Sequence, residues 1–184
     1  MQIIAGEKRG AKLMPLMGQS VRPTAQRARE SIFNILHGGK FADDLDQGII
    51  LDLFAGSGAL GLEALSRGAE LCYAVEKSAE AVSVIKKNSQ KLGYEDKMKI
   101  TQGDCLSLKA WPHPPAPIVF CDPPYDQGLA LPALAHMRTL GAIATGALII
   151  IETRKTETLA LPSDLICLDE RRYGMAAVTF CRYH

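Results

Sequence analysis

The sequence contains no uninterrupted apolar run that approaches the roughly 20 residues of a membrane-spanning helix. Residues 1–13 lack a cationic leader followed by an apolar block, so we expect no signal peptide. The 5 cysteines include no C-x-x-C pair, and Cys72, Cys121 and Cys181 lie within apolar runs, which is typical of reduced, buried thiols. These absences predict a cytoplasmic protein that neither spans a membrane nor depends on disulfides.

Metal-ligand patterns are absent as well. His37, His113, His136 and His184 are scattered, and none has a carboxylate or thiol at ligand spacing. Structural and catalytic metal sites bring three or four such ligands together. We therefore expect no metal site.

The composition is that of a folded domain. Of the 184 residues, 47% are hydrophobic and 22% are charged, a balance that excludes intrinsic disorder, collagen and a coiled coil. A chain of this size buries about 70% of the surface that its unfolded form exposes, so it needs neither disulfides nor a metal to fold. The length predicts one domain with at most a small extension.

The net charge of +1 conceals an uneven distribution of charge along the chain. Residues 1–40 carry a net charge of +5, whereas residues 41–184 carry −4. A basic arm on a mildly acidic body is the pattern expected where one end faces phosphates. A solvated basic terminus with no partner is equally compatible with this pattern.

The basic arm is expected to form a short hairpin and a helix. Residues 3–4 and 12–14 flank two glycines, as the strands of a hairpin do, and a helix is expected over 25–36. At 100° per residue, Arg29 borders the apolar stripe of this helix, whereas Arg27 lies on the water side. We therefore divide the chain into an extension, 1–40, and a main domain, 41–184.

From residue 49 onward, strands and helices are expected to alternate, because nearly continuous apolar runs are separated by capped helical segments. The expected strands are 49–54, 71–75, 97–101, 117–121 and 147–152, and the expected helices are 59–67, 78–92 and 129–140. Two last strands, 165–171 and 175–182, would form an antiparallel hairpin around Tyr173-Gly174. This order predicts an α/β protein with a Rossmann-like, doubly wound sheet of seven mostly parallel strands.

A glycine loop follows the first of these strands. Gly56, Gly58 and Gly61 match G-x-G-x-x-G between a strand and a helix, where glycines let a ligand approach main-chain N–H groups. Glu76 follows about 20 residues later, where a carboxylate can accept both hydroxyl groups of a ribose. This combination predicts an adenosine-containing cofactor, either a dinucleotide or S-adenosylmethionine.

Two more acids favour the second cofactor. Asp52 lies in an otherwise apolar strand, where an ionised carboxylate is costly without a partner. A methionine ammonium would supply a cation there, whereas a pyrophosphate would add negative charge. Asp104 follows the third strand and could accept a hydrogen bond from an adenine amino group. Either acid alone is also compatible with simply capping a turn or a loop.

The sequence Asp122-Pro123-Pro124-Tyr125 ends the fourth strand. Prolines fix φ and remove N–H donors, so carbonyl acceptors would be aimed rigidly at the crevice beyond the strands. The Asp122 carboxylate and the Pro123 carbonyl could accept both hydrogens of an exocyclic amine, with Tyr125 stacked on the base. Alone, the motif is also compatible with a rigid turn.

Together these motifs resemble the class I, S-adenosylmethionine-dependent amino-methyltransferases. More closely, segments 22–36, 52–69 and 122–125 are similar to the bacterial RsmD family, and the resemblance spans essentially the whole chain. That family methylates N2 of a guanine in 16S rRNA within an assembled small-subunit particle. The resemblance implies S-adenosylmethionine as cofactor and 16S rRNA, in a 30S subunit or late precursor, as partner. We expect a monomer.

Carried over by position, the resemblance implies functional residues of three kinds. The cofactor contacts would come from Asp52, Phe54, Gly56, Gly58, Glu76 and Asp104. The base would be held by Asp122, Pro123 and Tyr125. The basic residues expected to face RNA are Lys8, Arg9, Arg22, Arg27 and Arg29, although the position of Arg29 also allows a structural ion pair.

Other functions fit parts of the same pattern. The spacing of the motifs does not distinguish guanine N2 from adenine N6, so a DNA or RNA adenine-N6 or cytosine-N4 methyltransferase stays open. A nicotinamide-dependent oxidoreductase would use the glycine loop but would give Asp-Pro-Pro-Tyr no role. A ribosome-assembly factor with a vestigial fold and no catalysis also stays open; it predicts that Asp122→Ala leaves every measurable activity intact.

Overall fold

The computed structural model describes residues 1–17, 23–38, 41 and 48–184. Within these residues four helices are assigned: α1 (Pro23–Gly38), α3 (Ala59–Ser66), α4 (Ala79–Leu92) and α5 (Ala130–Thr139). The strands are β1 (Ile49–Leu53), β2 (Leu71–Glu76), β3 (Met98–Gln102), β4 (Ala116–Cys121), β5 (Ile143–Arg154), β6 (Leu165–Tyr173) and β7 (Ala176–Tyr183). The predicted elements are all present. The largest difference is at β5, which begins four residues earlier than expected because Ile143 pairs with Ala116 ahead of an irregularity in the register.

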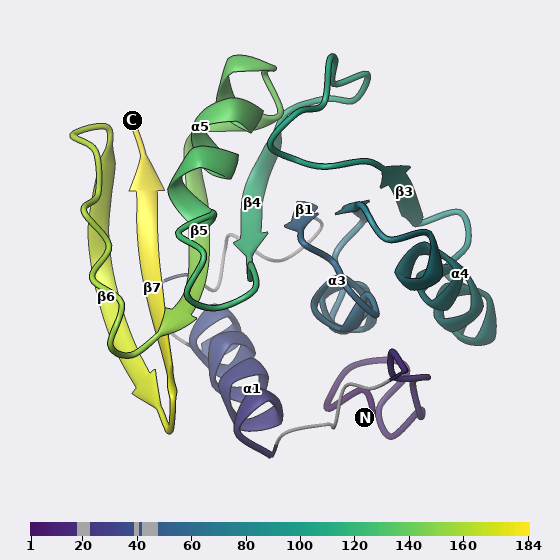
Figure 1. Ribbon diagram of the computed structural model, residues 1–184. Coiled ribbons are helices and arrows are strands. Elements are labelled where there is room, and N and C mark those ends of the chain that lie inside the picture. The colour runs from purple at the N-terminus through teal and green to yellow at the C-terminus, as the bar shows by residue number, and fades with distance from the viewer. Residues whose placement is uncertain (18–22, 39–40, 42–47) are drawn as a thin grey trace.

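All seven strands form one sheet in the order β3-β2-β1-β4-β5-β7-β6 (Figure 1). The first five strands run parallel to one another, and β7 pairs antiparallel with both β5 and β6. The predicted parallel sheet with an antiparallel C-terminal hairpin is confirmed. Strand order reverses at β1, which lies between β2 and β4, and ligands of open α/β sheets bind at such a reversal.

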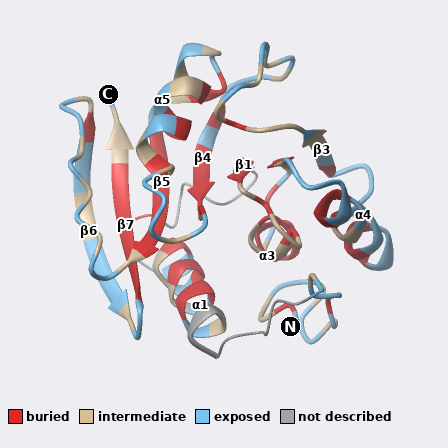
Figure 2. Cartoon of the chain, in the orientation of Figure 1, coloured by how far each residue is buried: buried red, intermediate tan, exposed pale blue. Residues whose placement is uncertain are grey.

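The central strands of the sheet are covered on both faces, which explains why β1, β4 and much of β5 are nearly continuous apolar runs, whereas the edge strand β6 is largely exposed. One face buries Ile50, Phe120 and Ile150 against α1, α3, α4 and the N-terminal hairpin. The other buries Leu51 and Val119 against α5 and nearby loops. Figure 2 shows the resulting buried strands between the two layers.

The N-terminal hairpin packs on the main domain. It closes with an antiparallel bridge between Gln2 and Lys12, which confirms the predicted hairpin. The buried carboxylate of Glu63 on α3 fastens it, because its oxygens accept hydrogen bonds from the N–H groups of Ile4 (2.7 Å) and Ala5 (3.0 Å). Ile3 and Leu13 of the hairpin are buried in an apolar cluster that also contains side chains of α1 and of the sheet.

Cys72, Cys121 and Cys181 are buried free thiols, as predicted. Within the described ranges, no helix combines the length and apolar character needed to cross a membrane.

Candidate functional site

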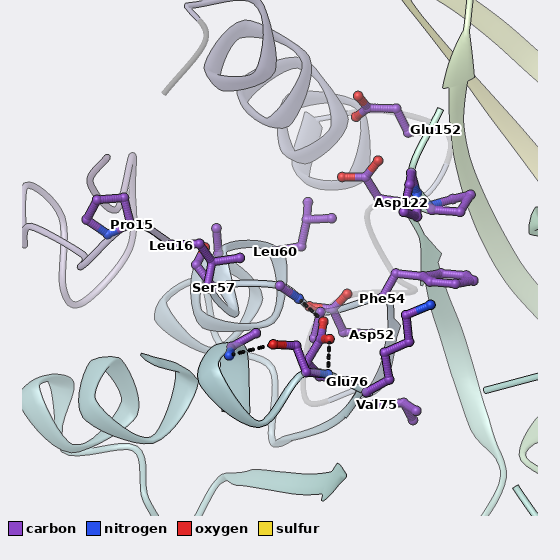
Figure 3. Close-up of a pocket in the computed structure, with 18 of the residues that line it drawn as sticks. Pro15, Leu16, Asp52, Phe54, Ser57, Leu60, Val75, Glu76, Asp122 and Glu152 are labelled. Atoms are coloured by element: carbon purple, nitrogen blue, oxygen red, sulfur yellow. Dashed lines mark hydrogen bonds between the residues drawn. The ribbon is translucent and has the colours of Figure 1, made fainter. Parts of the chain in front are cut away.

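A cavity of about 800 Å³ opens beyond the carboxyl ends of the central strands (Figure 3). This volume lies within the usual range for small-molecule sites. Most of the predicted site residues line it: Arg29, Asp52, Phe54, Gly56, Glu76, Asp104, Asp122, Pro123 and Tyr125. With the exception of Gly58, the residues predicted to contact the cofactor therefore share one cavity with those predicted to hold the base.

The glycine loop turns sharply between β1 and α3. Gly56 (φ 56°) and Gly58 (φ 78°) adopt left-handed conformations that side chains oppose. Gly61 serves a different purpose: a Cβ there would lie 2.5 Å from the Cys72 Sγ, so only glycine lets α3 approach β2 this closely. Gly58 precedes the helix without lining the cavity.

Glu76 holds the loop in place from the end of β2. Its Oε2 accepts a hydrogen bond from the Gly56 N–H (2.8 Å), and its Oε1 accepts one from the Ser78 N–H (2.8 Å) (Figure 3). Each carboxylate oxygen has two lone pairs, so both retain capacity for further donors such as ribose hydroxyls.

Asp52 is 1% exposed and reaches the start of α3. Its Oδ2 accepts a hydrogen bond from the Gly61 N–H (3.1 Å), so the capping interpretation is correct for this oxygen. Its Oδ1 is buried and has no hydrogen-bond partner among the described residues. Burial raises the pKa of Asp52 to about 7 despite the hydrogen bond from Gly61. The carboxyl therefore lacks the partner that its ionised form requires.

Asp104 follows β3 and lines the same cavity. Its Oδ1 accepts the Leu106 N–H (3.0 Å), so it also caps a local turn. Asp104 can therefore cap this turn and still accept a hydrogen bond from a ligand in the cavity.

The Asp-Pro-Pro-Tyr sequence forms the opposite side of the cavity. Burial, together with the neighbouring carboxyls of Glu152 and Asp52, raises the pKa of Asp122 well above its usual range. The Tyr125 hydroxyl donates a 2.6 Å hydrogen bond to Oε1 of Glu152, which fixes one edge of the phenol ring.

Glu152 is a cavity residue that the sequence interpretation missed. It lies on β5, is 8% exposed, and points to the same side as Asp122 (Figure 3). Burial raises its pKa, and the hydrogen bond from Tyr125 partly opposes that shift. An acid at the end of the apolar run ALIIIE carries the same signal that singled out Asp52.

A second missed feature is the segment Pro15, Leu16 and Met17, which lines the cavity beside the glycine loop. Asn88 on α4 anchors this segment, because its side chain bonds the Met14 N–H (2.7 Å) and the Met14 carbonyl (3.1 Å). The same amide donates to the Ser57 carbonyl (3.0 Å) in the glycine loop. Sequence alone gave no signal for this, since Asn88 is one polar residue on an amphipathic helix.

The predicted RNA-facing residues occupy different environments. Arg29 is 6% exposed, lines the cavity and donates to the Gln2 carbonyl (2.9 Å), while Arg27 is exposed, as the helical pattern predicted. Lys8 forms an ion pair with Glu7 (2.7 Å), and the Lys8 N–H donates a hydrogen bond to the side-chain hydroxyl of Ser66 at the end of α3. Arg9 is exposed on the same turn. Arg22 lies outside the described residues.

Among the residues that the structure describes, no group of three or more His, Cys, Asp or Glu side chains is arranged to hold a metal ion. The described lining of the cavity offers carboxyl groups, backbone groups and the phenol of Tyr125, together with the cationic side chains of Arg29 and Lys77.

Comparison with known proteins assigns the family. The model of the family described as "Conserved hypothetical protein 95" matches residues 1–182. The chain is 36% identical over 179 residues to "Ribosomal RNA small subunit methyltransferase D" of Haemophilus influenzae, covering 96% of this chain and 90% of that protein. This chain belongs to the RsmD family.

Another curated relative and a solved structure show similar agreement. The protein of the same name from Escherichia coli strain K12 is 36% identical over 152 residues, covering 83% of this chain and 74% of that protein. The solved structure of yhhF from Escherichia coli has a TM-score of 0.85 and 32% identity, covering 100% of this chain and 98% of that one. The predicted class I methyltransferase fold is confirmed.

Proposed function

We propose that this protein transfers a methyl group from S-adenosylmethionine to the exocyclic N2 amine of one guanine in 16S rRNA of the small ribosomal subunit. Its relatives in Haemophilus influenzae and Escherichia coli are named as methyltransferases of small-subunit ribosomal RNA. The observation that carries the proposal is that the strand-end acids Asp52, Glu76 and Asp104 line one cavity with Asp122, Pro123 and Tyr125.

The cofactor end of the cavity fits S-adenosylmethionine. The unpartnered, buried Oδ1 of Asp52 needs a cation or a donor, which a methionine ammonium provides. Glu76 has lone pairs left for two ribose hydroxyls, and Asp104 is available to an adenine amine. Carboxyl groups outnumber basic side chains among the described lining residues, which disfavours a pyrophosphate. When bound, S-adenosylmethionine supplies an electrophilic methyl group.

The base end acts by orientation. Asp122 and the Pro123 carbonyl accept the two amine hydrogens, so the nitrogen lone pair is directed away from the base plane and toward the methyl group. Tyr125 stacks on the base, and its hydrogen bond to Glu152 holds the ring. As the new nitrogen–carbon bond forms and the sulfur–carbon bond breaks, the amine becomes acidic. Its proton then leaves to Asp122 or to water.

The RNA backbone would be held by the first 40 residues, with the exposed Arg27 facing phosphates and the buried Arg29 beside the flipped nucleotide. The enzyme would act as a monomer on an assembled 30S subunit or a late precursor. Under this proposal, residues 1–40 are an RNA-facing extension of the methyltransferase domain 41–184.

The test is transfer of tritiated methyl groups to small subunits from cells that lack the enzyme, followed by identification of the methylated nucleoside. Asp122→Ala should lower the methylation rate by about 100-fold or more, while affinity for S-adenosylmethionine stays nearly unchanged. Glu76→Ala should mainly weaken cofactor binding. Labelling of adenine or cytosine would replace the guanine assignment, and absence of label on any subunit would remove the proposal.

A further inference from the structure

Glu152 has no task in the mechanism above beyond holding Tyr125, yet its carboxyl group is buried beside another one. The pairing of β4 with β5 aligns Cys121 with Ile151, so Asp122, directly after β4, lies beside Glu152 on β5. Figure 3 shows both carboxyl groups pointing to the same side, into the cavity. Two buried carboxyl groups that lie side by side repel each other when both are ionised, so each raises the free energy of ionising the other. Such a pair is stabilised by a ligand that donates hydrogen bonds to both groups.

Glu152 is held as an acceptor. The Tyr125 hydroxyl donates to its Oε1 at 2.6 Å, and a donated hydrogen bond favours the ionised carboxylate. A carboxylate offers about four lone-pair positions, so this one bond leaves acceptor capacity directed at the cavity. Asp122 and Glu152 thus present two adjacent acceptors, at the point where the base edge would enter.

Only some bases carry two adjacent donors. Guanine has the N1–H group next to its N2 amine, whereas the ring nitrogen next to the reactive amine of adenine or cytosine is an acceptor. A carboxylate facing that acceptor would place lone pair against lone pair and leave both buried groups without a hydrogen bond, which is unfavourable. Sites built to bond one polar group reject analogues that lack it far more strongly than apolar pockets reject a missing methylene.

We propose that Glu152 accepts a hydrogen bond from N1–H of the guanine whose N2 amine is held by Asp122 and Pro123, and thereby selects guanine over adenine and cytosine. This inference rests on the proposed function. Glu152 is accordingly a specificity-determining residue, and the choice of base is made at the end of β5 as well as in the Asp-Pro-Pro-Tyr turn.

The test uses 2-aminopurine, which keeps the 2-amine but has an acceptor at N1 in place of the N1–H donor. Once the methylated nucleotide has been mapped with the wild-type protein, small subunits are reconstituted with guanosine or 2-aminopurine riboside at that position. The measured quantity is the ratio of kcat/KM for the two particles. The wild-type protein should favour guanosine by about 100-fold or more.

Two variants separate selection from a general loss of activity. Glu152→Ala removes the acceptor, and Glu152→Gln keeps the size while adding a donor that suits the N1 of 2-aminopurine. Both should lower the preference for guanosine by about 10- to 100-fold, with the larger effect in Glu152→Gln. A purely structural role would slow both particles equally and leave the ratio unchanged, which would overturn the inference.

Further measurements make every outcome decisive. Affinity for S-adenosylmethionine should stay within a few-fold of the wild-type value in both variants, which shows that they fold. If a variant is too slow for rate measurements, the ratio of its affinities for the two particles replaces the ratio of rates. Failure of the wild-type protein to methylate guanine N2 at all would refute the proposed function, whereas an unchanged ratio in an active enzyme refutes only the role of Glu152.

Discussion

Asp52→Asn tests the central electrostatic feature of the cavity, a buried carboxyl without a full set of partners. The pKa of Asp52 is raised from 3.8 to about 7, mainly because the group is buried. The folded protein therefore holds a proton that the unfolded chain has released, and the free energy of unfolding falls as pH rises from about 4 to about 7. At 1.36 kcal/mol for each pKa unit, the full penalty above pH 7 is about 4 kcal/mol.

Urea unfolding at about pH 5.5 and about pH 8.5 measures this penalty. Between these two conditions the wild-type protein should lose about 2 kcal/mol through Asp52, because the carboxyl passes through its folded pKa. Asparagine does not titrate, so the stability of Asp52→Asn relative to wild type should improve by that amount. Asp122 and Glu152 are present in both proteins, so their contributions cancel in the difference except for the repulsion between Asp52 and Asp122, which the substitution also removes.

The matched control is Asp96→Asn, which changes an exposed carboxyl in the loop before β3. Its stability relative to wild type should be nearly the same at both pH values. If Asp52→Asn also shows a difference that is independent of pH, the carboxyl is not held neutral by burial, and the argument for a missing cation partner fails.

The same residue predicts a proton linked to ligand binding. A methionine ammonium beside Asp52 would favour the carboxylate, so binding of S-adenosylmethionine at about pH 6.5 should release part of a proton. Titration calorimetry in two buffers of different ionisation enthalpy reports this number directly. In Asp52→Asn the release should disappear, and affinity should fall by about 10- to 100-fold, the usual worth of one hydrogen bond to a charged group.

Two further predictions concern packing and RNA. Gly61→Ala brings a methyl group against the Cys72 Sγ and should destabilise the protein by about 1–3 kcal/mol in urea unfolding; Gly38→Ala, which has open space, should not. Arg27→Ala should lower the slope of log affinity against log salt for small-subunit binding by about one unit, and an unchanged slope would exclude a phosphate contact. The matched control is Lys99→Ala, which should leave the slope unchanged. Lys99 is exposed on β3, at the edge of the sheet that lies away from β6 and β7.

The sequence predicted the fold almost completely, because its signals are local. Apolar runs mark each strand, and the helix after Glu76 begins at a Ser78 cap and ends at Gly93 in a left-handed conformation. The antiparallel tail followed from its turn residues. The irregular start of β5 was missed, because it depends on pairing with Ala116 across the sheet.

For Asp52 and Asp104 the sequence left two interpretations open, and the structure shows why neither excluded the other. A carboxylate has two oxygens, and in both residues one oxygen caps a backbone N–H group while the side chain still lines the cavity. Local capping holds the carboxyl in position, and the lone pairs that remain can serve a ligand. Capping a backbone N–H group and binding a ligand are therefore compatible roles for the same carboxyl.

Glu152 was missed for a different reason. Its meaning depends on Asp122, which lies 30 residues earlier in the chain and becomes its neighbour only through the register of β4 and β5. Asn88 is a similar case, because its three bonds reach Met14 and Ser57 on two distant segments. Such relations arise from strand order and packing, and no periodicity within a single element records them.

The basic N-terminal segment shows how far a net charge can be interpreted. The charge of +5 is a sum over residues 1–40, and the basic side chains that the structure describes there lie in unlike positions. Arg29 is buried against the Gln2 carbonyl, and Lys8 is paired with Glu7, so neither offers a fully available charge to a phosphate backbone. Arg27 and Arg9 are exposed, so their charges are available to a phosphate backbone. Since the salt dependence of RNA binding counts the phosphates that are neutralised, it should follow the outward residues one by one rather than the total charge of the segment.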